Sequence, residues 1–299
     1  MTVSFRGVIP ALVTPFRDEK IDREALVRHV NWVIAEGVNA VLPCGTTGES
    51  PTLSHEEHNL VVSLTVEAAA GRVPVLAGAG SNSTSEAVHM AKHAASVKAD
   101  GLLLVSPYYN KPTQEGLYRH FITVAEAAGL PVILYNIPSR CGVNILPPTM
   151  ARLAAHPLIV GVKEATGELN QMIRTIELCG PDFLVTSGDD GLTLPLLAVG
   201  GGGVISVAAN IIPGPLVQMW RAWEAKDLAA TKRLFYQMLP FFRALFFETN
   251  PIPLKFLLGL TGRMTGEVRL PMCPPSDSVQ KELAGLADQW GLTNAGSKS

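Results

Sequence analysis

Residues 159–165 read Ile-Val-Gly-Val-Lys-Glu-Ala, a run of strand length in which apolar residues lead up to Lys163. A short apolar run of this kind is typical of a strand buried in a parallel sheet. An ammonium group is costly there, because desolvation disfavours the charged form. Lys163 is therefore either a structural lysine that reaches water or pairs with Glu164, or a neutral amine that can attack a carbonyl.

Seven more runs of this kind occur along the chain and alternate with longer amphipathic segments. The eight expected strands are residues 8–13, 40–44, 75–79, 101–106, 132–135, 159–163, 183–187 and 204–207. The expected helices include residues 21–36, 55–70, 85–96, 114–128 and 170–178. The sequence carries two helix-start signals. Ser54 stands three residues before Glu57, and Asp22 stands just before a run with helical apolar periodicity. Strands that alternate with helices pair in parallel through crossovers.

Eight such units predict an α/β fold, a TIM (β/α)8 barrel over residues 1–225. The alternative is an open doubly wound sheet, but Gly78-Ala79-Gly80 is followed by serine and asparagine, so no dinucleotide-binding glycine pattern opens a first helix. Residues from about 213 to 291 read as helices without strands. We therefore expect a C-terminal helical segment over residues 226–299 packed on the barrel, with residues 293–299 frayed.

The composition favours a cytoplasmic protein with a large core. The chain of 299 residues is 47% apolar and 17% charged, with a net charge of −2 and no basic run, which argues against nucleic acid or an anionic membrane as partner. Residues 1–7 lack the pattern of a secretory signal, and no apolar stretch approaches the ~18 residues of a membrane span. Four widely spaced cysteines without a CxxC pair suit reduced thiols.

Two close histidine pairs raise the question of a metal site. His55 and His58 do not have the zinc-protease spacing, and His89 and His93 have a helical spacing that usually marks a solvated face. We expect no metal. The glycine run at residues 200–203 precedes its strand, so it lies on the wrong face for the usual barrel phosphate site, and we expect no phosphate-bearing cofactor.

The residues with the most reactive or polar side chains follow the expected strands, at the face where barrel enzymes hold their active sites. They are residues 45–49 after the second strand, 107–110 after the fourth, 135–140 at the fifth, Lys163 on the sixth and 188–190 after the seventh. Because these positions converge on one face of a barrel, the catalytic interpretation of Lys163 is favoured over the structural one.

Three of these features have a chemical use and an ordinary alternative. Residues 45–48 offer backbone N–H groups and two hydroxyls to a small carboxylate, or form a simple glycine-rich turn. Tyr135 is either a proton donor and acceptor beside Lys163 or a core tyrosine with its hydroxyl at the rim. Arg140 either binds a carboxylate bidentately or is a solvated loop arginine.

Four segments carry a resemblance to the pyruvate-dependent class I aldolases. They are residues 45–49 (Gly-Thr-Thr-Gly-Glu), 108–112 (Tyr-Tyr-Asn-Lys-Pro), 135–142 (Tyr-Asn-Ile-Pro-Ser-Arg-Cys-Gly) and 161–167 (Gly-Val-Lys-Glu-Ala-Thr-Gly). The likeness runs from about residue 7 to residue 292 and is greatest to the branch that condenses pyruvate with L-aspartate 4-semialdehyde at the entry to the diaminopimelate/lysine pathway. Sister aldolases that act on N-acetylneuraminate or 2-keto-3-deoxy sugar acids keep the lysine and tyrosine but generally lack the arginine and the double threonine. A non-catalytic metabolite-binding barrel is a further alternative.

The resemblance implies a lyase that needs no cofactor and uses a Schiff base on Lys163. Tyr135, Thr46 and Tyr109 would relay protons, with Tyr109 reaching in from a neighbouring subunit of a homotetramer built as a dimer of dimers. The resemblance assigns the binding of pyruvate and L-aspartate 4-semialdehyde to Thr47, Arg140, Ile205 and Gly188.

The resemblance also implies feedback inhibition by L-lysine at a second site. Residues matching that site are His55, His58, Asn82, Glu86, Tyr108 and Pro51. Physically, Glu86 suits the ammonium of the ligand, while the alternative is a helix with solvated histidines. Pro51 stands where lysine-sensitive members often have a small residue, and Cys141 where threonine is common.

Overall fold

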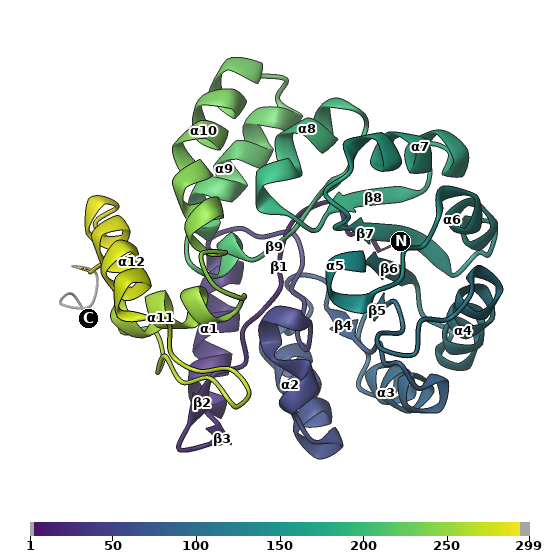
Figure 1. The fold of residues 1–299 in the computed structure, drawn as a ribbon, viewed down its shortest axis with the longest axis horizontal. Helices are drawn as coiled ribbons and strands as arrows, with labels where there is room; N and C mark the ends of the chain where they lie inside the picture. Colours follow the sequence, from purple (N-terminus) through teal and green to yellow (C-terminus); the bar gives the residue numbers. More distant parts are fainter. Residues whose placement is uncertain (1–2, 294–299) are drawn as a thin grey trace.

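The computed structural model describes residues 3–293 and places a parallel sheet at the centre of a ring of helices (Figure 1). The sheet has the strand order β1-β9-β8-β7-β6-β5-β4. Its strands are β1 (Gly7–Pro10), β4 (Leu76–Gly78), β5 (Gly101–Val105), β6 (Val132–Asn136), β7 (Ile159–Glu164), β8 (Leu184–Ser187) and β9 (Gly203–Ser206). All six strand pairs in this sheet are parallel, as the alternation of strands and helices predicted.

The segment expected as the second strand, residues 40–44, closes the ring without forming a regular strand. Its Leu42 bridges Ala11, directly after β1, and its Val41 bridges Val75, directly before β4. Pro43 accepts a hydrogen bond from the Gly78 N–H at 3.0 Å but has no N–H to donate, and the residue after it has a left-handed backbone (φ 56°), so the regular ladder is interrupted here. The prediction of a full strand here was wrong, whereas the α/β barrel class is confirmed.

Besides the one-turn helix α5 (Pro138–Cys141), eight helices connect or follow the strands of the described chain. They are α1 (Arg23–Ala35), α2 (His55–Ala69), α3 (Thr84–Ser96), α4 (Gln114–Ala128), α6 (Pro147–Ala154), α7 (Leu169–Cys179), α8 (Thr193–Ala198) and α9 (Pro213–Glu224). Asp22 caps α1, and Ser54 with Glu57 forms a capping box on α2. The expected start of α1 at residue 21 was wrong, because β3 (Lys20–Ile21) pairs with β2 (Phe16–Arg17) in a hairpin.

Three further helices follow α9 and no strand follows β9 in the part of the chain that the structure describes. They are α10 (Leu228–Ala244), α11 (Ile252–Leu260) and α12 (Asp277–Gln289). Figure 1 shows α12 on the outer side of α11. Of the end expected to fray, residues 294–299 lie outside the described residues. Within residues 3–293, no helix combines the length and the apolarity needed to span a membrane.

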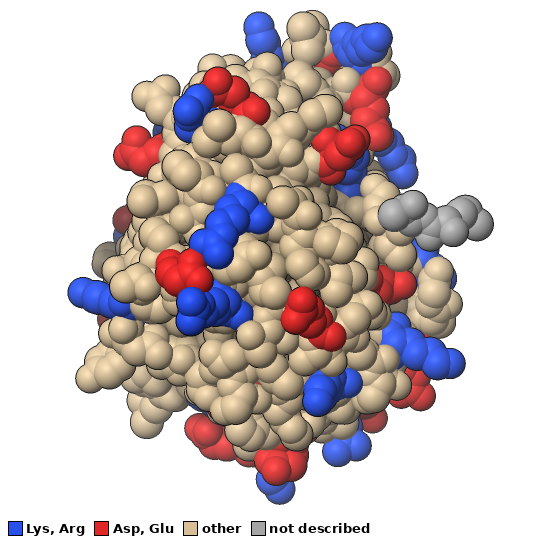
Figure 2. All heavy atoms as spheres, turned by 90° about the vertical axis from the view of Figure 1, so that its right-hand side faces the viewer, with Lys and Arg blue, Asp and Glu red and all other residues tan. Residues whose placement is uncertain are grey.

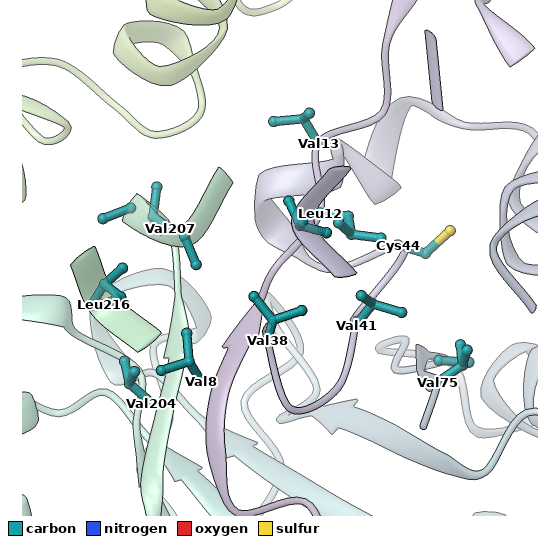
Figure 3. Close-up of a cluster of buried hydrophobic side chains, with 14 of the residues drawn as sticks. Val8, Leu12, Val13, Val38, Val41, Cys44, Val75, Val204, Val207 and Leu216 are labelled. Carbon is teal, nitrogen blue, oxygen red and sulfur yellow. The ribbon is translucent and has the colours of Figure 1, made fainter. Parts of the chain in front are cut away.

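The alternation of side chains along the strands divides the core in two. Val8, Val41 and Val204 belong to the outer cluster between sheet and helices (Figure 3), whereas the next residue along each strand belongs to the cluster inside the barrel. By the same alternation Val162 points outward, so Lys163 points inward. On the face drawn in Figure 2, basic and acidic side chains are interspersed, in keeping with the small net charge.

Candidate active site

Lys163 and Tyr135 face each other inside the barrel. They are register partners on the neighbouring strands β7 and β6. The Lys163 side chain is buried (5% exposed), and its Nζ lies 4.1 Å from the centroid of the Tyr135 ring. The strand pairing thus places the primary amine of Lys163 against the face of the Tyr135 phenol ring.

Burial determines the protonation of both groups. The pKa of Lys163 is lowered to about 7, chiefly by desolvation; the charge of Asp190 opposes this shift and the charge of Arg140 adds to it. Desolvation raises the pKa of Tyr135 to about 12, although a hydrogen bond with Thr46 and the charge of Arg140 lower it. At neutral pH the site therefore offers an amine that is substantially unprotonated and a phenol that keeps its proton.

Asp190 is a buried carboxylate to which sequence reasoning assigned no role. Its Oδ2 accepts hydrogen bonds from the backbone N–H groups of Val207 and Ala208, both at 3.0 Å, and Ser206 Oγ donates to its Oδ1. Burial nevertheless raises the pKa of Asp190 to about 6. The acidic pair after β8, the seventh expected strand, was visible in the sequence, but only the folded chain shows that one of the two acts on Lys163.

The loop at residues 45–48 lies at the carboxyl end of the second barrel segment. Its residues Thr46–Gly48 form a 3-10 turn, η1, in which Thr46 contacts Tyr135 and Thr47 is buried. Thr47 Oγ1 accepts a hydrogen bond from Asn250 Nδ2 at 3.0 Å. Because that oxygen accepts from Asn250, its own proton is free to be donated to a carboxylate.

Gly188 leaves the space that the Lys163 side chain occupies. A Cβ atom at this position would lie 3.1 Å from Lys163 Cε and 2.7 Å from Ala165 Cβ. The backbone N–H of Gly188 donates to Glu164 O at 2.7 Å. Ile205 is fully buried in the cluster inside the barrel.

Arg140 is exposed at the mouth of the site, in the short helix α5 (Pro138–Cys141). Its Nη2 donates to the backbone carbonyl of Asn250 at 3.2 Å. Asn250 thus contacts both residues expected to hold substrate carboxylates, Arg140 and Thr47. Sequence reasoning missed Asn250, which lies just before α11 and far from both of them along the chain.

A cavity of about 330 Å³ joins the candidate catalytic residues to the candidate lysine site. Thr46, Tyr135 and Arg140 are among the residues that line it. The members of the lysine set that line it are Pro51, His55, His58, Glu86 and Tyr108. Asn82 does not line the cavity; its carbonyl accepts a hydrogen bond from Asn110 Nδ2 at 2.8 Å. Lys163, which contacts the Tyr135 ring, is also absent from the lining.

The lysine set holds one ionised carboxylate. Glu86 Oε1 lies 2.6 Å from His55 Nε2, and Ser81 Oγ donates to Oε2. These two hydrogen bonds keep the pKa of Glu86 below its ordinary value. His58 is buried, and its Nε2 donates to Gly78 O at 2.9 Å. The arrangement presents a negative charge to an ammonium group that enters the cavity.

Tyr109 is the one predicted catalytic residue that the chain does not bring to its own site. Its side chain is 91% exposed, and its backbone is left-handed (φ 72°). It does not line the cavity that Thr46 and Tyr135 share. Among residues 3–293, no three His, Cys, Asp or Glu side chains are grouped to hold a metal ion.

Comparisons with known proteins point in one direction. Residues 4–290 match the model of the dihydrodipicolinate synthetase family. The chain is similar to the 4-hydroxy-tetrahydrodipicolinate synthase of Nitratidesulfovibrio vulgaris, with 51% identity over 97% of this chain and 100% of the relative.

Two solved structures with similar folds carry small molecules. One is DHDPS from Cyanidioschyzon merolae with lysine bound, 41% identical, with a TM-score of 0.93 over 96% of this chain and 99% of the other. The other is the chloride-inhibited dihydrodipicolinate synthase from Acinetobacter baumannii complexed with pyruvate, 41% identical, with a TM-score of 0.94 over 97% of this chain and 100% of the other.

Proposed function

The chain belongs to the dihydrodipicolinate synthetase family, and from that premise we propose that it condenses pyruvate with L-aspartate 4-semialdehyde to 4-hydroxy-tetrahydrodipicolinate, the first committed step of the diaminopimelate/lysine pathway. The observation that carries this proposal is the buried amine of Lys163, whose pKa is lowered to about 7 and which lies against Tyr135. An amine with such a pKa is a nucleophile toward a ketone at neutral pH.

The reaction follows from that amine. Lys163 Nζ attacks the C2 carbon of pyruvate, and loss of water from the carbinolamine gives an imine. The imine draws electrons from the methyl group, so a methyl proton is lost and an enamine forms. The enamine carbon adds to the aldehyde of the second substrate. The amino group of that substrate then displaces Lys163 and closes the six-membered ring.

Each of these steps moves a proton, and the hydroxyls beside Lys163 supply the route. Tyr135 keeps its proton at neutral pH, so it can protonate the leaving hydroxyl of the carbinolamine and recover a proton later. Thr46 hydrogen bonds Tyr135 and extends the relay. Tyr109 of a second copy would complete it, which fits the exposure of this side chain on its own protomer.

The two substrates are held by their carboxylates. Thr47 and the backbone at Ile205 would bind pyruvate, and Gly188 keeps space free next to Lys163. Arg140 would bind the carboxylate of the semialdehyde at the mouth of the site. A planar guanidinium offers two parallel donors to a carboxylate, which suits recognition of a mobile second substrate.

L-Lysine would inhibit the enzyme from the adjoining part of the cavity. Glu86 offers an ionised carboxylate to the side-chain ammonium of the ligand, and Tyr108 adjoins relay residue Tyr109. The relative from Cyanidioschyzon merolae, which has lysine bound, supports the proposal. Pro51 lines the same cavity and would set the affinity.

The enzyme would be a cytoplasmic homotetramer, a dimer of dimers, that needs no cofactor. Its four cysteines are free, which suits a reducing compartment. The exposed Tyr109 supports an assembly in which two copies share a site. The C-terminal segment from residue 226 onward would pack on the barrel formed by residues 1–225.

The test is condensation of pyruvate with L-aspartate 4-semialdehyde, coupled to the reductase that consumes the product, with and without L-lysine. We expect turnover that L-lysine suppresses. Turnover that L-lysine leaves unchanged would remove the regulatory proposal alone. No turnover by the folded oligomer, together with cleavage of N-acetylneuraminate or a 2-keto-3-deoxy sugar acid, would assign the chain to a sister aldolase instead.

A further inference from the structure

A second buried lysine lies on the other side of the loop that carries Thr46 and Thr47. Lys255 of α11 is fully buried, and its ammonium forms an ion pair with Glu49, whose side chain is also buried. Its Nζ lies 4.1 Å from the centroid of the Phe16 ring. Nothing in the proposed reaction uses this pair.

Glu49 directly follows the η1 turn, and all its polar groups are engaged. Its N–H donates to Thr46 O at 3.1 Å, and its carbonyl accepts from the N–H and the hydroxyl of Thr52, both at 3.0 Å. One carboxylate oxygen accepts from Lys255 and the other from the backbone N–H of Arg269 at 3.0 Å. Its backbone is left-handed (φ 53°, ψ 35°), a strained conformation for a residue with a side chain, which persists only where the surroundings hold it.

Arg269 fixes the same region a second time. Its guanidinium donates to Thr52 O at 3.0 Å and forms a bidentate pair with Glu57 at the start of α2. It also lies over the Phe16 ring that Lys255 contacts, 4.2 Å from the centroid. Lys255 and Arg269, both from the C-terminal part of the chain, therefore hold the end of the loop that begins at residue 45. Their contacts there are with Glu49 and Thr52.

We propose that the buried Glu49–Lys255 ion pair is a positioning device that fixes Thr46 and Thr47 for pyruvate binding and proton relay. Through this pair, the C-terminal helical segment would help to set the geometry of the active site. The inference rests on the proposed function, which assigns those threonines their roles. A buried ion pair stabilises a fold poorly compared with packed apolar residues, and in some proteins such a pair instead specifies a single geometry.

The test is a double variant, Glu49→Gln with Lys255→Met, which removes both charges together and keeps an acceptor for the Arg269 N–H. The matched control is Glu115→Gln with Arg152→Met, which makes the same chemical change at an exposed ion pair. The readouts are circular dichroism, the KM of each substrate, kcat, and the pyruvate concentration that half-saturates borohydride trapping.

We expect the double variant to fold and its KM and half-saturating concentration for pyruvate to rise at least about tenfold. Its KM for the semialdehyde should change less than about twofold, because Arg140 is on another loop, and trapping at saturating pyruvate should persist. The control should match the wild type. A general loss of active protein would instead lower kcat alone and leave both KM values unchanged.

Glu49→Asp keeps both charges and shortens the side chain by one methylene, so it tests the inference even where the double variant does not fold. We expect a severalfold rise in the pyruvate KM. Suppose that the wild-type enzyme turns over and that either variant folds with wild-type kinetic constants. This result overturns the positioning role and leaves the proposed function intact. A wild type without turnover would instead count against the proposed function.

Discussion

Lys163 and Lys255 are both buried, but they differ in what surrounds the ammonium group. Burial lowers the pKa of Lys255 as well, but the Glu49 carboxylate lies within hydrogen-bond reach and opposes that shift. Lys163 has the face of Tyr135, the more distant charge of Asp190 and the opposing charge of Arg140. On this difference in pairing rests our proposal that Lys163 is the nucleophile and that Lys255 holds the loop in position.

The rate at which pyruvate forms its imine should rise with pH through about 7, the pKa of Lys163, and level off above about 8. The sign follows because burial lowers the pKa from 10.5, so the reactive free amine is populated as pH rises through the lowered value. Rapid-quench borohydride trapping at a series of pH values measures it. Arg140→Met removes a charge that lowers this pKa, so the midpoint should move upward. A wild-type midpoint near 10 would contradict the prediction.

Gly188→Ala should slow imine formation by at least about tenfold while leaving the fold intact. The added methyl group would lie 3.1 Å from Lys163 Cε and 2.7 Å from Ala165 Cβ, so it displaces the nucleophile. Gly285→Ala is the control, because a Cβ there meets no atom within 4 Å. The trapping rate with pyruvate measures the effect, and equal rates in the two variants would refute the argument.

The sequence indicates some residues of the candidate site and conceals others. Lys163 stands out because an ammonium group is unusual in an apolar strand. Asp190 and Asn250 do not, because their contacts join distant segments: Asn250 and Thr47 are 203 positions apart. A polar residue at a loop end is common, and only the folded chain shows which of them is buried against the site.

At the scale of elements, local signals predicted well wherever the local chain decides the structure. The predicted helix over residues 114–128 has the bounds that α4 has, and the start signals at Ser54 and Asp22 are caps in the structure. The predictions failed where strand pairing, rather than the local sequence, determines the secondary structure. Residues 40–44 read as a strand, but Pro43 interrupts its ladder, and the β2–β3 hairpin is too short to show a periodic pattern.

Ser54→Ala should lower stability by about 1 kcal/mol, because the capping box of α2 is lost. It should also weaken inhibition by L-lysine, since α2 carries His55 and His58, while the pyruvate KM stays unchanged. Thr113→Ala removes the N-cap of α4 and serves as the control for stability. Thermal melts and inhibition curves measure both effects. Equal loss of inhibition in the two variants would show that the cap does not act through the lysine site.

At the scale of the whole molecule, one protomer holds most of the proposed machinery but not all of it. Lys163, Tyr135 and Thr46 converge inside one barrel, whereas Tyr109 extends into solvent with 91% of its side chain exposed. The composition and the strand pattern predict the barrel, but they carry no information on which surface meets a second copy. We propose that the exposed Tyr109 marks that contact.

Co-expressed subunits with Tyr109→Phe and Lys163→Ala should regain activity that neither variant has alone. A mixed dimer holds one site with an intact Lys163 and a partner with an intact Tyr109, so about a quarter of wild-type activity is expected for random pairing. Lys163→Ala co-expressed with Tyr135→Phe is the control, because both residues belong to the same barrel and every site keeps a defect. The coupled condensation assay measures the difference, and no recovery in the first mixture would refute a shared site.

The central claim is that Lys163 is the nucleophile that holds pyruvate. The most direct measurement is borohydride reduction of the native enzyme with pyruvate, followed by peptide mapping by mass spectrometry. We predict one reduced pyruvate unit per subunit on the peptide that carries Lys163, none on Lys255, and none in Lys163→Ala. A folded wild-type enzyme without an adduct, or with the adduct on another lysine, would contradict the claim.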